Sequence, residues 1–497
     1  MKKRSVSLLL VGSLLSSLTV HAKPTEKRKP DAMVDRPPQF VLLAFDGSKD
    51  ISFWDESMAA AEGIPTIDST RKVRFTYFVN PTYYLGPENK KTYKTPYLGP
   101  GHSCIGWSNA TGDIPARIAR TNKAFETGHE IGSHANAHCD QSGKDSADPM
   151  FGHPWDESAW NSEFDQFNYL LFNAFQINGV KPLTPGKLGN GFSFGQDEIV
   201  GFRAPKLAVT AGLWPTLAKF KFRYDTSRTS SPDYWPQKQT WGGWNFPLAQ
   251  IKIAGTNKKT LSMDYNWLFY HSGGQTKPGI TPAEAQKMTD QMLDSYKYYF
   301  KTNYFGNRAP VHIGHHFSKW NLGAYWTAMQ AFAKFVCNKP EVRCVTYKEY
   351  ANWLDSLSPA TLESYRQGQF DRLKDDKTIK DIATPILADV RVESDANHFS
   401  AVVADADKMK VKALGWKPQL QINFVNQPDM KVDRAALMEQ YKGKNIMVRA
   451  TLVNRSGNEM NWQTYKVNNF GTPQETTVGP LEDKLLEGEG AEAHDGE

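Results

Sequence analysis

Two histidines spaced four residues apart are the first residues in this sequence that could carry chemistry. His134 and His138 lie in the stretch Thr127-Gly-His-Glu-Ile-Gly-Ser-His-Ala-Asn-Ala-His-Cys-Asp140. A strand ending in a loop, or one turn of helix, brings both imidazoles to the same side. Imidazole nitrogens at this spacing suit a first-row metal such as zinc, which also takes carboxylate oxygens. Alone, the pair also fits ordinary core or surface histidines.

A carboxylate follows the first apolar run of the chain. Residues 39–45, Gln-Phe-Val-Leu-Leu-Ala-Phe, are typical of a strand buried on both faces, and Asp46 comes directly after them. Barrel enzymes place catalytic groups at the C-terminal ends of parallel strands. The alternative interpretation of Asp46-Gly47 is a simple turn.

Three further groups of polar residues follow in chain order. They are Arg203 with Pro205, then Tyr224-Asp225 with Ser227, then the histidines His312, His315 and His316. The elements around them alternate. Strands are expected at 73–79, 130–131 and 342–346, and helices at 156–175, 281–301 and 348–354. The alternation over about 310 residues predicts a parallel sheet or barrel.

In this order, Phe45-Asp46, Ser133-His134-x3-His138, Arg203-x-Pro205, Tyr224-Asp225-x-Ser227 and His316 resemble the polysaccharide deacetylase family. This is carbohydrate esterase family 4, and the chitin-deacetylase-like branch is the most similar. The resemblance covers about residues 38–356. It implies an α/β fold, a distorted (β/α)7-type barrel, with a divalent metal, usually zinc. It also implies removal of N-acetyl groups from polymers of N-acetylglucosamine.

The family scheme assigns roles to residues at matching positions. Asp46 takes a proton from the attacking water, and His316 protonates the departing amine, although His315 stays an alternative acid. Arg203 would keep Asp46 ionised, and Asp225 could orient His316. The expected metal ligands are His134, His138 and Asp46. The expected substrate contacts are Pro205, Lys206, Trp235, His315 and Trp320.

The sequence departs from the family pattern at three positions. The usual Asp-Asp pair is Asp46-Gly47, so Asp46 is either the base or the third metal ligand. Lys206 replaces an aromatic residue whose backbone N–H is expected to bind the oxyanion, and that backbone donor survives the change. Gly314 stands where a bulky side chain normally packs beside the acetyl methyl, which predicts a wider pocket.

The ends of the chain predict an exported protein. Residues 1–22 have the charged start, apolar run and small-residue end of a signal peptide, and residues 23–37 form a Lys/Pro-rich lead-in. Residues 38–356 form the predicted barrel and 357–384 a linker. Residues 385–480 form a small β-rich domain for glycan binding or for stability, and 481–497 a disordered acidic tail. We expect a periplasmic or secreted monomer without a transmembrane segment.

Export makes disulfides plausible, and four cysteines allow three pairings. Cys337 and Cys344 bracket a short turn, which leaves Cys104 to pair with Cys139. The alternatives are free thiols, or Cys139 as a metal ligand. The formal charge of +6 includes no dense Lys/Arg stripe, which argues against nucleic acid as a partner.

The sequence therefore predicts a zinc-dependent deacetylase that acts on a polysaccharide such as peptidoglycan or a chitin-like glycan. Two alternatives remain. One is a glycan-binding protein on a degenerate deacetylase scaffold, and the other is an O-deacetylase of another polysaccharide. Because Asp46 is present, an enzyme is favoured over a binding protein.

Overall fold

The computed structural model describes residues 34–373 and 390–481, apart from 69–70, 184–185, 187, 257, 414, 424 and 454–458. The predicted signal peptide lies outside the described residues. So do residues 23–33 of the lead-in, 374–384 of the linker and 482–497 of the tail. Within the described part, no helix combines the length and the apolar composition that crossing a bilayer requires.

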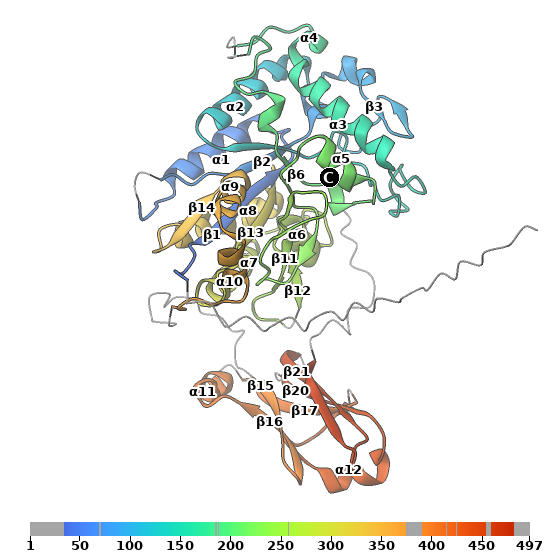
Figure 1. Cartoon of the computed structure of the whole chain (residues 1–497), viewed down its shortest axis with the longest axis vertical. Helices are drawn as coiled ribbons and strands as arrows, with labels where there is room; N and C mark the ends of the chain where they lie inside the picture. The colour runs from blue at the N-terminus through green and yellow to red at the C-terminus, as the bar shows by residue number, and fades with distance from the viewer. Residues whose placement is uncertain are drawn as a thin grey trace, which may run out of the picture.

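A mostly parallel sheet forms the centre of residues 34–373 (Figure 1). Its order is β13-β1-β2-β5-β6-β7-β10-β9, and β14 also pairs with β1. The only antiparallel pair along this path is β10 with β9. The strands are β1 Gln39–Asp46, β2 Thr76–Val79, β5 Glu130–Ser133, β6 Gly201–Phe202, β7 Tyr224–Asp225, β9 Gln237–Lys238, β10 Trp244–Asn245, β13 Val311–His316 and β14 Val342–Val345.

Strand β1 pairs with three strands, β13, β14 and β2, and all eight of its residues are buried. The strand predicted from its continuous apolar run is confirmed. Its register pairs Asp46 with His316 on β13 and with Phe78 on β2. Because these strands are parallel, their carboxyl ends meet, and Asp46 and His316 come level at one edge of the sheet.

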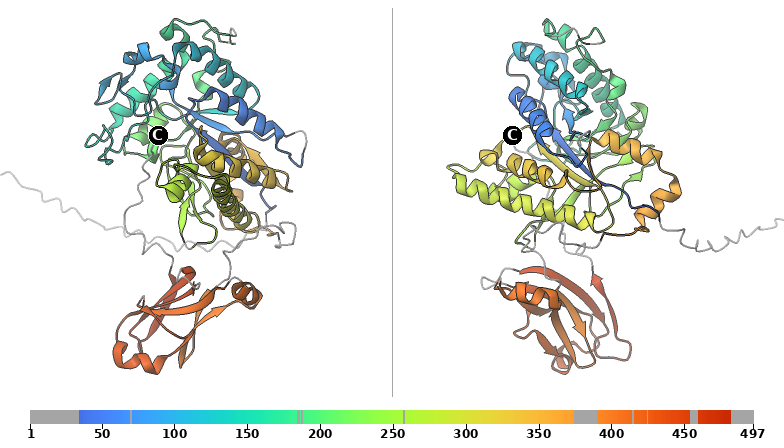
Figure 2. Two further views of the ribbon diagram at one scale, coloured as in Figure 1. Left: turned by 180° about the vertical axis from the view of Figure 1, so that it is seen from behind. Right: turned by 90° about the vertical axis from the view of Figure 1, so that its left-hand side faces the viewer.

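Helices surround the sheet and bury their apolar sides against it. They are α1 Ile51–Gly63, α2 Ile114–Glu126, α3 Glu157–Phe172, α4 Ala174–Asn178, α5 Leu213–Lys219, α6 Asp264–Ser272, α7 Pro282–Tyr304, α8 Trp320–Val336 and α9 Tyr347–Ser356. The predicted capping box at the start of α7 is confirmed. The Thr281 side chain accepts from the Glu284 backbone, and the Glu284 side chain accepts in return. The long helices α7 and α8 lie side by side (Figure 2).

The α/β class is confirmed, whereas a closed barrel of seven strand–helix units is not found. The sheet is an open path with β13 and β9 at its ends, and within the described residues these two strands do not pair. The insertion at 228–280 explains part of the difference. It adds β8 Thr229–Ser230, β11 Leu248–Lys252 and β12 Lys259–Leu261, which form a separate small sheet.

The first part of the predicted linker is a helix instead, α10 Pro359–Arg366. Its start has a clear cause, because Ser358 caps the Thr361 backbone N–H and Pro359 occupies the first turn. Tyr365 stacks on Trp235 and on Trp353 of α9. This aromatic contact fixes residues 359–366 to the sheet-containing part of the chain.

Residues 390–481 have a hydrophobic core of their own, which includes Phe399, Leu420 and Val448. Two antiparallel sheets supply it, in the orders β15-β16-β19 and β18-β17-β20-β21-β22. The elements are β15 Val390–Ser394, β16 His398–Val403, α11 Asp405–Ala413, β17 Lys417–Ile422, β18 Val425–Asn426, β19 Lys431–Asp433, α12 Arg434–Tyr441, β20 Ile446–Val453, β21 Glu459–Asn468 and β22 Thr476–Leu481. The alternating patterns at 420–424 and 446–452 correctly indicated strands.

Candidate functional site

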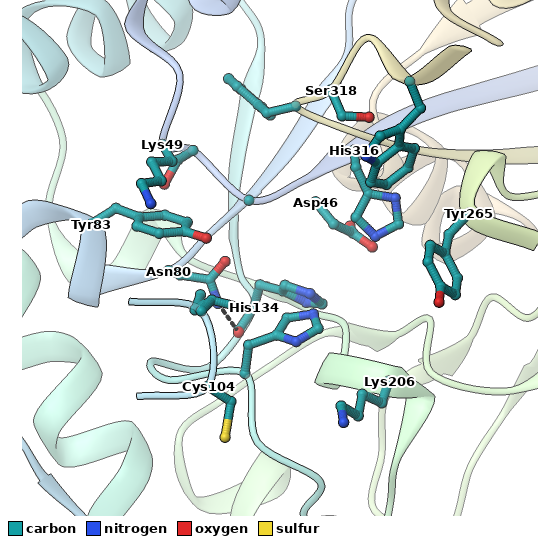
Figure 3. A pocket seen from close by; sticks show the side chains of 16 residues that line it. Asp46, Lys49, Asn80, Tyr83, Cys104, His134, Lys206, Tyr265, His316 and Ser318 are labelled. Carbon is teal, nitrogen blue, oxygen red and sulfur yellow. Dashed lines mark hydrogen bonds between the residues drawn. The ribbon is translucent and has the colours of Figure 1, made fainter. Parts of the chain in front are cut away.

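A cavity of about 350 Å³ opens where β1, β5 and β13 end, and it contains the residues singled out by their chemistry (Figure 3). It is lined by Asp46, Gly47, Ser48, Lys49, Asn80, Tyr83, Cys104, Ile105, His134, His138, Lys206, Tyr265, His316, Phe317, Ser318 and Trp320. The pocket thus brings together one predicted carboxylate and three predicted imidazoles from distant parts of the chain.

Asp46 is held by the arginine that the sequence predicted. The Arg203 Nη1 donates to Asp46 Oδ1 at 2.8 Å, and both side chains are almost fully buried. Burial lowers the pKa of Arg203, but Asp46 and its hydrogen bond outweigh this and raise the pKa above its usual value. The two side chains form a buried ion pair with a charge-assisted hydrogen bond.

His316 is held by Asp264, and not by Asp225 as expected. The His316 Nδ1 lies 2.6 Å from Asp264 Oδ1, and the His316 backbone N–H donates to Asp264 Oδ2 at 2.9 Å. Burial acts to raise the pKa of Asp264, yet the charges of His316 and His315 hold it below its usual value. Asp225 instead accepts from Ser227, whose hydroxyl lies 2.5 Å away.

The insertion places Asp264 beside β13 through backbone contacts. Met263 forms a bridge with Gly314, and the Gly314 N–H donates to the Ser262 carbonyl at 2.8 Å. Helix α6 starts at Asp264, one residue after that bridge. Asp264 lies in an insertion, residues 228–280, that the family motifs do not cover, so it was not among the predicted site residues. A carboxylate directly after a short strand was the available signal.

The wider pocket predicted beside Gly314 is not present. A Cβ atom at Gly314 would lie 2.8 Å from the Met263 Cε and 3.3 Å from the Arg203 Nη1. The Met263 side chain from the insertion therefore fills the space that a bulky residue would take. The glycine permits the close approach of two chain segments and adds no room for substrate.

The imidazoles of His134 and His138 meet edge to face, with ring centroids 5.0 Å apart. The His134 Nδ1 is 2.8 Å from the Arg203 carbonyl oxygen, so this nitrogen carries the hydrogen. Its Nε2 is buried without a hydrogen-bond partner. Burial lowers the pKa of His134 to about 3 and that of His138 well below its usual value. Both rings are therefore neutral with a lone pair to offer.

Hydrogen bonds and a disulfide hold the loop that carries the two histidines. Asn80 donates to the His134 carbonyl at 2.6 Å, and Thr82 donates to the Asn136 carbonyl at 2.7 Å. The Asn136 N–H donates to a carboxylate oxygen of Glu163 at 2.7 Å. The predicted disulfide between Cys104 and Cys139 is confirmed and ties the loop to the segment before α2. The second predicted disulfide, Cys337–Cys344, is confirmed as well.

The donor set fits a divalent metal in part. Two neutral imidazoles, one with an unpartnered Nε2, are suitable ligands, and the Arg203 carbonyl behind His134 fixes the tautomer that metal binding needs. However, no three ligand atoms from Asp46, His134 and His138 lie within 4.8 Å of one another. In the described residues that criterion is met only by Cys104, Cys139 and Asp148, where the two sulfurs are already bonded.

Lys206 lines the pocket with its backbone in a strained conformation. Its φ of +54° lies in the left-handed region that non-glycine residues avoid. The ammonium is tied to Asp145 and Asp148, each at 3.0 Å. In the part of the chain that the structure describes, we find no acceptor for the Lys206 backbone N–H. The Lys206 backbone N–H thus stays a candidate oxyanion donor at the pocket wall.

The remaining predicted contacts divide into two groups. Trp320 lines the pocket, with its ring centroid 5.4 Å from that of His316. Trp235 does not, because it is buried against Tyr365 and donates to the Asn307 carbonyl. His315 is also buried behind the pocket, 3.5 Å from Asp264, and burial lowers its pKa to about 4. His316 is thus the histidine of β13 that faces the cavity.

Comparison with protein-family models found no match, and comparison with curated proteins found none either. Comparison with solved structures found distant matches. A protein described as a polysaccharide deacetylase from Mycobacterium smegmatis is 16% identical, with a TM-score of 0.37 over 67% of this chain and 96% of that one. A chitin deacetylase from Colletotrichum lindemuthianum is 13% identical, with a TM-score of 0.31 over 64% and 91%.

A peptidoglycan deacetylase from Bacillus subtilis is 11% identical, with a TM-score of 0.30 over 67% of this chain and 99% of that one. An allantoinase matches at a comparable level, with 12% identity and a TM-score of 0.34. Since likeness this distant decides neither the reaction nor the substrate, the function has to follow from the residues of the pocket.

Proposed function

We propose that this protein is a metal-dependent deacetylase that removes N-acetyl groups from a polymeric amino sugar such as peptidoglycan or a chitin-like glycan. The observation that carries the proposal is the presence of two differently partnered groups in one pocket. Asp46, paired with Arg203, is a carboxylate, and His316, paired with Asp264, can carry a proton. Amide hydrolysis needs one group of each kind.

The residues of the chain divide the work as follows. Asp46 accepts the proton of the attacking water, and Arg203 keeps Asp46 ionised for this task. His316 donates a proton to the departing nitrogen, while Asp264 orients its ring. The Lys206 backbone N–H donates to the oxygen that gains negative charge. Trp320 offers an aromatic face for a sugar ring at the edge of the pocket.

His134 and His138 would hold the cation, which we take to be Zn²⁺, and Asp46 is the carboxylate that lines the pocket with them. When bound, the metal supplies a Lewis acid that polarises the acetyl carbonyl and makes water easier to deprotonate. With Gly47 in place of a second aspartate, Asp46 serves as base and also adds negative charge to the site. The two disulfides suit an exported, periplasmic or secreted protein.

Acetate release tests the proposal directly. The zinc-loaded protein should release acetate from N-acetylated glycans, lose the activity with a chelator and regain it with zinc. His316→Asn should remove the activity, while His153→Asn, at an exposed histidine outside the pocket, should not. Tight glycan binding without acetate release would support the binding-protein alternative. Release from O-acetylated glycans alone would support the O-deacetylase.

A further inference from the structure

Lys49 brings a positive charge to the pocket wall that no acid among the described residues balances. It lies two residues after Gly47, in the loop between β1 and α1, and its side chain is half-buried. The ammonium lies 5.8 Å from the centre of the Tyr83 ring (Figure 3). Neighbouring Asp50 is engaged elsewhere, because its carboxylate caps the first turn of α1. Among the described residues, Lys49 has no ion pair.

A buried arginine fixes the wall on which Lys49 stands. Arg117 of α2 is 1% exposed and donates to the carbonyl oxygens of Ser48 at 3.1 Å, Lys49 at 2.8 Å and Tyr83 at 2.5 Å. Its fourth bond, at 3.0 Å, goes to the Ser108 hydroxyl. All four acceptors are neutral. Arg117 therefore holds three pocket-lining residues in place and adds a second positive charge behind them.

The other charges of the pocket are already paired. Arg203 lies against Asp46, and Asp264 lies against His316. The Lys206 ammonium contacts two aspartates, Asp145 and Asp148. An ammonium in the pocket wall that has no carboxylate partner among the described residues can form a charge-assisted hydrogen bond with a carboxylate of a ligand. Among the described residues, no carboxylate forms an ion pair with Lys49, although this lysine lines the pocket.

We propose that Lys49 binds a carboxylate of the glycan, so that the substrate is an acidic, acetylated polymer and not neutral chitin. This inference rests on the proposed deacetylase function and narrows its substrate class. A carboxylate near the reacting N-acetyl group can come from a lactyl ether, as on muramic acid, or from a uronic acid. Both give Lys49 the same charge-assisted hydrogen bond.

Matched substrates test this directly. Acetate release by the zinc-loaded protein is measured on peptide-free peptidoglycan strands and on a polymer of alternating uronic acid and N-acetylhexosamine. Each is compared with its own carboxyl-amidated form, and N-acetylglucosamine oligomers serve as a neutral reference. We expect kcat/KM to be about tenfold higher on the carboxylated form of one polymer. The polymer that shows the difference identifies the source of the carboxylate. The preference should shrink as ionic strength rises.

The matched variants are Lys49→Met, Lys49→Arg and Lys219→Met. Lys219 is an exposed lysine whose ammonium also lies over an aromatic ring, 5.3 Å from the centre of Phe220. We expect Lys49→Met to lose the preference for the carboxylate and to keep its rate on the amidated form. Lys49→Arg and Lys219→Met should behave like the unchanged protein.

Two results would overturn the inference while the proposed function stands. One is acetate release at equal kcat/KM from the carboxylated and amidated polymers. The other is a preference that survives in Lys49→Met. Acetate release from none of the substrates would instead remove the proposed function, and this inference with it.

Discussion

His134 and His316 line the same pocket, but different groups stand behind their rings. Behind His134 is the neutral carbonyl of Arg203, and behind His316 is the carboxylate of Asp264. The hydrogen bond to the Arg203 carbonyl fixes the tautomer and acts to raise the pKa of His134, but burial outweighs it and lowers that pKa to about 3. A carboxylate favours an imidazolium. His134 is thus suited to be a neutral ligand, whereas His316, on the other side of the pocket, is suited to donate a proton.

The two walls are also built from different kinds of chain. The wall of His134 is a loop fastened by Asn80, Thr82, Glu163 and a disulfide. The wall of His316 is the end of strand β13, joined to the insertion by a bridge next to Asp264. The position of His134 thus depends on side-chain contacts to its loop, and we call this side of the pocket the ligand wall. The position of His316 depends on strand register, and we call this side the acid wall. Substitutions at single residues can therefore disturb one wall and leave the other unchanged.

The largest effect is expected at Asp46, which lies between the two walls. Asp46→Asn should lower turnover by about 10²- to 10⁴-fold because the base is removed. It also leaves Arg203 buried without its charge partner, which costs about 3–5 kcal/mol of folding free energy. Acetate release, circular dichroism and zinc content are measured together.

Asp50→Asn is the matched control for this variant, because asparagine also caps a helix well and should change none of the three measurements. Zinc content distinguishes the two roles of Asp46. If Asp46→Asn retains zinc, the residue acts mainly as the base. If the site is empty, Asp46 is a ligand and the base must be sought elsewhere.

The acid wall is tested at Asp264. Asp264→Asn should reduce turnover on the order of a hundredfold, since the His316 ring loses the partner that orients it. Losing the carboxylate disfavours an imidazolium, so the alkaline limb of the pH–rate profile should move to lower pH. Asp225→Asn, at a buried aspartate without that contact, should leave the limb in place. The reverse pattern would restore the original assignment to Asp225.

The ligand wall is tested at Glu163, which accepts from the Asn136 N–H and from the Tyr93 hydroxyl. Burial raises the pKa of Glu163 to about 7, against about 4.3 in an unfolded chain. Between these values the folded protein keeps a proton that the unfolded chain releases. The free energy of unfolding should therefore fall as pH rises from about 5 to about 7.

Glu163→Gln should remove this contribution, so that its loss of stability over the same range is smaller by about 2 kcal/mol. Urea unfolding at several pH values measures it, and the difference from the unchanged protein cancels other titrating groups. Glu157→Gln, at an exposed position of the same helix, is the control. Equal slopes for Glu163→Gln and the unchanged protein would mean that Glu163 does not titrate in this range.

The smallest effect is expected at Gly47, where the usual second aspartate is absent. Gly47→Asp should tighten zinc binding severalfold by returning a carboxylate to the two imidazoles. The φ of +83° strains any side chain by about 1–2 kcal/mol, although a Cβ there meets no atom within 4 Å. Gly47→Ala carries the same strain without the carboxylate. Calorimetric zinc affinities that are equal in the two variants would show that position 47 cannot reach the metal.

Much of this site could be predicted because its residues follow buried strands in a fixed order. Asp46 ends an apolar run, and the partner Arg203 follows from the short motif with Pro205. Both disulfides followed from cysteine spacing. These signals are local, and parallel pairing then brings the strand ends together without further information.

The features of the site that the sequence did not predict depend on contacts between segments that are far apart in the chain. Asp264 and Asp225 are both aspartates near short strands, and only the bridge between Met263 and Gly314 selects the first. Trp235 was predicted to contact a sugar, yet its ring stacks on Tyr365. Tyr365 belongs to helix α10, which the sequence predicted to be part of a linker. The motifs therefore indicate which residues react, while the insertion determines which residues support them.

The disulfide beside the histidines links the oxidation of the chain to the maturation of its site. Cys139 directly follows His138, and Cys104 lines the same pocket. In a reducing compartment this bond is absent and the His138 side of the loop loses its covalent anchor. The protein would then reach full metal affinity only after oxidation, which separates the place of synthesis from the place of activity. Recombinant material made in a reducing cytoplasm would need an oxidation step before its zinc affinity is representative.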